Sequence, residues 1–119
     1  EMSRIMLALE VVIAKHYPVG TYIFDEVDAG VGGKAAIDVG KRLHQLAEHS
    51  QVIVVTHLPQ VAGYGDQHFM VCKKEEGNST VSYLKHLNAN ERIDELANML
   101  SGNQATDIAR ENAKELLKA

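Results

Sequence analysis

Two adjacent acidic residues, Asp25 and Glu26, follow directly after the short apolar run formed by residues 21–24. Carboxylates at the end of a buried strand are suited to holding a hydrated magnesium ion and to placing a base beside the water that attacks a nucleotide γ-phosphate. In this interpretation Asp25 is the carboxylate on the metal side. Glu26 polarises or deprotonates the water, which is typically worth a factor of about 10²–10⁴ in rate. The alternative is that strand ends are often acidic because they reach solvent.

A loop rich in glycine comes after the two acids. Asp28 extends the acidic group, and the loop contains Gly30, Gly32 and Gly33. Glycine permits positive φ angles or a close approach of another molecule to the backbone. A phosphate loop of the Walker A type needs Lys followed by Ser or Thr after its last glycine, whereas this loop continues with Lys-Ala. The loop is therefore not the primary phosphate site, and a plain turn into the next helix remains the alternative.

A second group of polar residues follows the apolar run at residues 52–55. His57 stands at the end of that run, where it can donate a hydrogen bond to a phosphate oxygen. Gln60 is a candidate for a second polar contact, although an amide on a helix surface is the better interpretation of this residue. A single histidine is usually structural, and the other histidines lack the spacing of zinc ligands, so the sequence predicts no zinc site. These are His16, His44, His49, His68 and His86.

The elements that position these residues follow from the spacing of apolar side chains. Spacings of three and four predict amphipathic helices over residues 2–16 and 34–48, and continuous apolar runs predict strands over 21–24 and 51–56, both fully buried. The order helix, strand, helix, strand implies a right-handed crossover and a parallel pair of strands. Ligands of open α/β sheets bind beyond the carboxyl ends of the strands. We therefore expect the acids and His57 to point to one side.

The rest of the chain predicts further helices and a hairpin. A short helix is expected through about residue 64, followed by strands near 68–73 and 80–87. Asn88 and Glu91 have the spacing of a capping pair, Gly102 closes the helix that they begin, and Thr106 is a cap for the last helix. The predicted fold class is α/β, with a mainly parallel central sheet flanked by helices.

Length and composition limit the number of domains and the classes of function that the chain can have. The 119 residues suit one compact domain, and the net charge of −4 gives no overall attraction to nucleic acid. Cys72 is the single cysteine, which excludes an internal disulfide and fits a reducing cytosol. The chain has neither a run of the roughly 20 apolar residues that span a bilayer nor a signal peptide, so we expect no membrane partner and a cytoplasmic location. Because Glu1 stands inside a helical pattern, we expect the chain to be a piece of a longer protein.

Several sequence motifs resemble those of one family. The run TYIFDEVDAGVGG is similar to the Walker B motif and D-loop of ABC ATPases, in the form typical of RecN, an SMC-like DNA repair family. The run VVTHLPQVAGYGD resembles the switch-histidine region of that family, and EMSRIMLALE resembles the helix after its signature motif. The runs RIDELANMLSG and ATDIARENAKELL look like the helices that close a RecN head. The resemblance covers nearly the whole chain.

The resemblance implies a P-loop NTPase fold, with residues 1–119 as the C-terminal lobe of an ABC/SMC-type ATPase head. Asp25 would be the magnesium-associated residue, Glu26 the catalytic base and His57 the γ-phosphate sensor, while residues 28–33 would be the D-loop that meets a second head. The implied cofactors are ATP and Mg²⁺, and the implied partners are a second head, in an ATP-sandwiched homodimer, and DNA. The implied role is double-strand-break repair and recombination at the nucleoid. Because the Walker A lobe, the coiled coil and most of the signature are missing, we expect this chain alone not to hydrolyse ATP.

Two other classes of function compete with this interpretation. A magnesium- or phosphate-binding α/β module without ATPase activity, similar to receiver domains, would need a Lys after a later strand and an early acidic pair, and the position of His57 disfavours it. The second competing class is a purely structural dimerisation lobe in which the acids are vestigial. Retention of Glu26 argues against this class, because loss of the base is the simplest way to lose catalysis.

Overall fold

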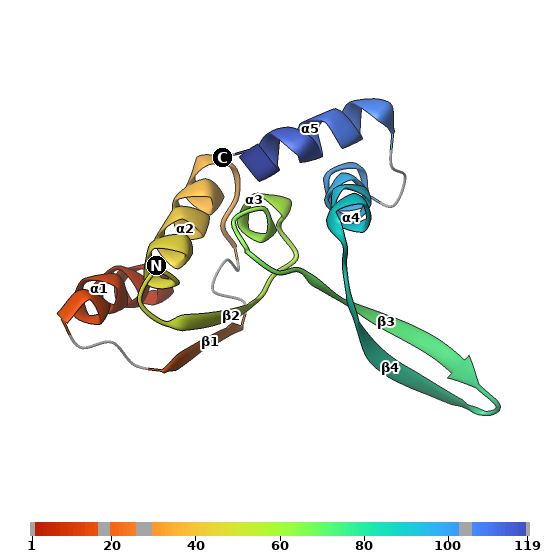
Figure 1. Ribbon diagram of the computed structural model, residues 1–119, viewed down its shortest axis with the longest axis horizontal. Helices are drawn as coiled ribbons and strands as arrows, with labels where there is room; N and C mark the ends of the chain where they lie inside the picture. Colours follow the sequence, from red (N-terminus) through yellow and green to blue (C-terminus); the bar gives the residue numbers. More distant parts are fainter. Residues whose placement is uncertain (1, 17–19, 26–29, 103–105, 119) are drawn as a thin grey trace.

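The computed structural model describes residues 2–16, 20–25, 30–102 and 106–118. Its helices and strands follow one another as Figure 1 labels them. In chain order they are α1 (Met2–His16), β1 (Thr21–Asp25), α2 (Gly33–Leu46), β2 (Gln51–Val55), α3 (Pro59–Ala62), β3 (Phe69–Glu76), β4 (Ser79–His86), α4 (Ala89–Ser101) and α5 (Asp107–Lys118).

Strands β1 and β2 form the predicted parallel pair. Their register runs from Thr21 opposite Gln51 to Asp25 opposite Val55, and α2 is the crossover between them. Helices α1 and α2 lie on the same side of the pair (Figure 1). Their apolar faces, joined by one residue of α3, form the main core, against which alternate residues of both strands pack. The buried residues are Leu7, Val11, Ala36, Val39, Leu43, Leu46 and Val61, and the strand residues are Tyr22, Phe24, Val52 and Val54.

The expectation that both strands are buried on both faces is wrong for the described part of the chain. Ile23 is 72% exposed, Ile53 46% and Val55 56%. These side chains alternate with those that face the core, because successive residues of a strand point to opposite faces of the sheet. The helices cover only one of those faces. The continuous apolar runs therefore predicted the strands correctly, but the prediction that both faces of the sheet are covered was wrong.

Strands β3 and β4 form the predicted hairpin, which is a separate antiparallel sheet. The register runs from Phe69 opposite His86 to Glu76 opposite Ser79, and Gly77 makes the turn with a φ of +59°. The hairpin extends away from the helices (Figure 1). It does not enlarge the parallel pair, which has two strands among the residues that the structure covers.

Helices α4 and α5 pack on each other through a second, smaller core of Leu96, Ala97, Ala109 and Ala113. The predicted caps are confirmed. The Asn88 side chain accepts a hydrogen bond from the backbone N–H of Glu91, and the Glu91 side chain accepts one from that of Asn88. Gly102 ends α4 in the left-handed conformation. Thr106 Oγ1 accepts a hydrogen bond from the N–H of Ala109 at the start of α5, at 3.1 Å.

Candidate functional site

The carboxyl edge of the parallel pair holds two of the predicted site residues. Asp25 is the last residue of β1, and its side chain is exposed. Its register partner is Val55, the last residue of β2, and exposed His57 follows two residues later. Adjacent parallel strands end at the same edge of the sheet, so Asp25 and His57 lie at one edge. The roles of these two residues stay a prediction.

The turn after β2 fixes the backbone around His57. Thr56 Oγ1 accepts a hydrogen bond from the backbone N–H of Leu58 at 3.0 Å. Pro59 then begins α3, a position that proline favours because the first N–H groups of a helix lack intrahelical partners. His57 therefore stands between the end of a strand and the first turn of a helix, with the backbone restrained on its carboxyl side.

The glycine loop leads directly into α2. Gly30 and Gly33 have φ angles of +71° and +57°, which favour glycine, whereas Gly32 is extended. Positive φ is thus confirmed at two of the three glycines. A Cβ atom added at any of the three would meet nothing within 4 Å, so no packing in the described part of the chain requires glycine here. In the described residues 30–32 the loop is a turn into α2.

Gln60 lies half-buried on α3. Its Oε1 atom is shielded from solvent and has no hydrogen-bond partner among the residues described. The interpretation of Gln60 as an ordinary surface amide therefore does not fit this oxygen. Its role as a second polar contact stays a prediction.

Two of the predicted residues, Glu26 and Asp28, lie outside the described residues, as does Glu1. The structure gives no geometry for the predicted base or for the acidic part of the loop. In the ranges that it covers, no three His, Cys, Asp or Glu side chains are grouped as metal ligands. No helix in those ranges is long and apolar enough to cross a membrane.

Sequence reasoning missed one polar side chain that contacts the segment after α3. Arg92, in the first turn of α4, reaches the backbone that follows α3 and donates hydrogen bonds to the carbonyl oxygens of Ala62 and Gly65. Burial lowers the pKa of the Arg92 guanidinium, and this effect outweighs the opposite effect of the Asp66 charge. Contacts between residues about 30 positions apart leave no periodic signal in a sequence, so the pattern gave no sign of this one.

Comparison with known proteins identifies relatives of the chain. No protein-family model matches it. Among curated proteins, DNA repair protein RecN of Streptomyces coelicolor is 54% identical over 118 residues, which are 99% of this chain and 21% of that protein. RecN of Mycobacterium leprae is 51% identical over 119 residues, and RecN of Vibrio cholerae 45%, each over 100% of this chain. The chain spans about a fifth of the length of these relatives. The predicted resemblance to RecN is confirmed.

A solved structure shares the fold. It comes from work on the structural biochemistry of ATP-driven dimerization and DNA-stimulated activation of SMC ATPases. The TM-score is 0.61 at 23% sequence identity, over 80% of this chain and 56% of that one. The chain therefore has the α/β fold of part of an SMC ATPase, which confirms the predicted fold class.

Proposed function

We propose that this chain, whose relatives are RecN proteins, is the C-terminal lobe of an ATPase head that binds and hydrolyses ATP in the complete protein. Since those relatives are named as DNA repair proteins, we assign the complete protein to double-strand-break repair and recombination at the nucleoid. DNA and a second ATPase head are the proposed partners of the complete protein.

One observation carries the proposal. Asp25 ends β1 opposite Val55, the last residue of β2, and His57 follows two residues later, at the edge where α/β sheets bind ligands. The exposed carboxylate of Asp25 suits Mg²⁺, which is usually bound through one or two carboxylates together with substrate phosphates. Magnesium, when bound, would neutralise charge on the ATP phosphates.

The other residues have roles that follow from their positions. Glu26, directly after Asp25 in the chain, would take a proton from the attacking water. His57 would donate a hydrogen bond to an oxygen of the γ-phosphate, and such a donor stabilises the charge that develops there. Gln60 on α3 would be a second polar contact.

The glycine loop is the proposed contact with a second head. The space around Gly30 and Gly33 supports it, because nothing in the described chain occupies the positions where their Cβ atoms would lie. Asp28 belongs to the same segment of the sequence. ATP held between two heads would couple its hydrolysis to their separation.

The test is ATP turnover by the full-length protein, comparing wild type with Glu26→Gln and His57→Ala. We expect Glu26→Gln to lose about 100-fold or more in kcat while ATP binding is retained, because removal of a general base affects the chemical step. Asp38→Asn is the matched control, since Asp38 is an exposed acid within α2 and is not one of the predicted site residues. Unchanged turnover in Glu26→Gln would overturn the proposal and favour a binding module without ATPase activity.

A further inference from the structure

Arg92 of α4 binds the carboxyl end of α3. Its Nη2 atom donates to the carbonyl oxygen of Ala62 at 3.1 Å and lies 3.4 Å from that of Gly63, and it also contacts the carbonyl oxygen of Gly65. All three acceptors belong to the last residue of α3 or to the turn that follows it. Helices α3 and α4 pack beside each other, which brings the guanidinium to this position (Figure 1).

This contact matters because α3 is too short to be stable as an isolated helix. It has four residues, Pro59–Ala62, whereas isolated helices need roughly 12–15 residues to be even marginally stable in water. The last carbonyl groups of a helix have no intrahelical partners, and a cation there also compensates the helix dipole. A guanidinium supplies several donors in a fixed plane, so Arg92 suits this role better than a lysine would.

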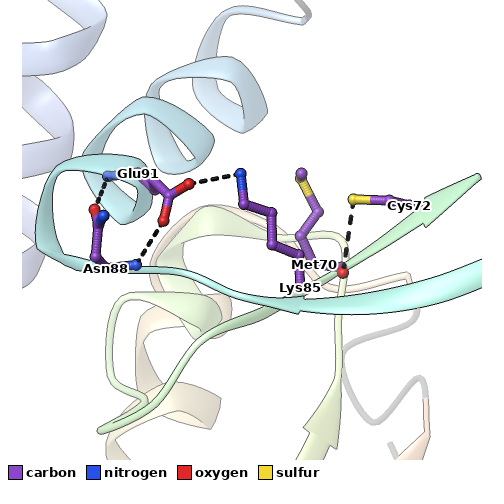
Figure 2. A network of polar contacts seen from close by, with 5 residues as sticks. All are labelled: Met70, Cys72, Lys85, Asn88 and Glu91. Carbon is purple, nitrogen blue, oxygen red and sulfur yellow. Dashed lines mark hydrogen bonds and ion pairs between the residues drawn. The ribbon is translucent and has the colours of Figure 1, made fainter.

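The backbone that carries the Arg92 side chain is held in place at the start of α4. The Asn88–Glu91 capping box defines the first turn of the helix, and the second oxygen of Glu91 binds the Lys85 ammonium at 2.6 Å (Figure 2). Arg92 is the next residue along this turn. Its side chain therefore extends from a backbone that is tied both to its own helix and to β4.

The backbone that carries His57 is restrained on two sides. Thr56 accepts a hydrogen bond from the N–H of Leu58 before α3, and Arg92 donates to the carbonyl of Ala62 at the end of α3 and lies near that of Gly63. Between them, buried Val61 anchors α3 in the main core. Loss of the Arg92 contact would remove one of the restraints on the carboxyl end of α3, and this short helix connects that end to the turn on which His57 stands.

We propose that Arg92 is a positioning residue for His57, acting through the carboxyl end of α3. The inference rests on the proposed function, in which His57 contacts the γ-phosphate. Arg92 does not touch the nucleotide in this proposal. It fixes the turn that aims His57, and misplacement of a catalytic group by about 1 Å can cost on the order of 100-fold in rate.

The test is a double-mutant cycle on ATP turnover by the full-length protein, with Arg92→Ala, His57→Ala and the double variant. We expect Arg92→Ala to lower kcat by about tenfold or more with ATP affinity retained. In the His57→Ala background Arg92→Ala should cause little further loss, because residues that act as a unit are not additive. Arg92→Lys should recover part of the rate, since it keeps a charged donor.

The control is Arg110→Ala, which removes an exposed arginine that pairs with Asp94 on the surface of α4 and α5. It should leave turnover unchanged. Equal losses from Arg92→Ala with and without His57 would overturn the positioning role while leaving the proposed function intact. No loss from His57→Ala alone would instead contradict the role of His57 in the proposed function. If Arg92→Ala does not fold, Arg92→Lys replaces it in the cycle, and additive losses from that variant would overturn the proposal equally.

Discussion

The two sheets in the described part of the chain differ both in the composition of their strands and in their packing. The parallel pair β1–β2 has one face against α1 and α2, and its strand ends carry Asp25 and lead to His57. Hairpin β3–β4 has most of its side chains exposed along both strands, including Val71 and Leu84, which are register partners. The candidate site thus lies on the sheet that packs against the main core.

The hairpin is anchored at its base. The backbone N–H of Leu87, which is buried, donates to the carbonyl of His68 at 3.0 Å, and the rings of Phe69 and His86 stack at 4.8 Å. Beyond these residues, the strands hold each other through their own ladder of hydrogen bonds. An isolated two-stranded hairpin is marginally stable at best, so the base must stabilise the whole element. The comparison teaches that strands of either composition can pair, whereas burial of their side chains depends on which elements lie beside the sheet.

The largest expected effect comes from a matched pair of leucine truncations, one in each region. Leu46 is fully buried in the main core, and Leu84 of the hairpin is 67% exposed. Leu46→Ala should lower the free energy of unfolding by about 2–5 kcal/mol, since it removes buried surface and leaves a cavity. Leu84→Ala should change it by no more than about 0.5 kcal/mol. Urea unfolding of the chain measures both.

The effect of Leu84→Ala on stability tests whether the hairpin is exposed in solution while the parallel pair is packed against a core. A loss from Leu84→Ala that equals the loss from Leu46→Ala would mean that the hairpin face is covered in solution, for example by a second copy of the chain. A dependence of the Leu84→Ala effect on protein concentration would identify such self-association, because association shifts apparent stability by mass action.

The next effect concerns the junction of the two regions, where the hairpin leads into α4. Asn88→Ala should lower the free energy of unfolding by about 1 kcal/mol, because it leaves the N–H of Glu91 without the Asn88 oxygen. Asn90→Ala is the control, since Asn90 is exposed on the same turn but is not the cap. No greater loss from Asn88→Ala than from Asn90→Ala would show that the Asn88 cap does not stabilise the start of α4.

Local signals made much of this fold predictable. The bounds of α1 match the predicted 2–16, and the capping pair Asn88 and Glu91 appears as expected, because caps and helical periodicity depend on residues only three or four positions apart. The strand ends bring Asp25 and His57 to one edge for a similar reason, since the crossover connection dictates parallel pairing.

Features that depend on distant contacts were not predictable. The open face around Ile23 depends on which layers surround the sheet, and the contact of Arg92 with Ala62 joins residues 30 positions apart. The shielded oxygen of Gln60 depends likewise on how α3 packs against its neighbours. None of these has a signature in the spacing of residue types along the chain.

The smallest expected effect is a pH dependence at the base of the hairpin. Burial, and to a lesser extent the charge of Arg92, lowers the pKa of His68 below its ordinary value, and its Nδ1 atom is shielded from solvent without a hydrogen-bond partner in the ranges described. The folded chain therefore favours neutral His68. Because the unfolded chain takes up the proton more readily, stability should fall as pH drops below about 6.5 and level off below the folded pKa. Above that window His68 is neutral in both states and contributes no slope.

The measurement is urea unfolding at pH 7.5 and at pH 5.5, compared between wild type and His68→Gln. Wild type should lose more stability than the variant on acidification, since only wild type carries the group with the lowered pKa. His49→Gln, which removes an exposed histidine in the turn after α2, is the control. Equal losses in wild type and His68→Gln would mean that the hairpin base opens to solvent readily enough to protonate His68. The base would then resemble the exposed strands beyond it rather than the core that supports the site.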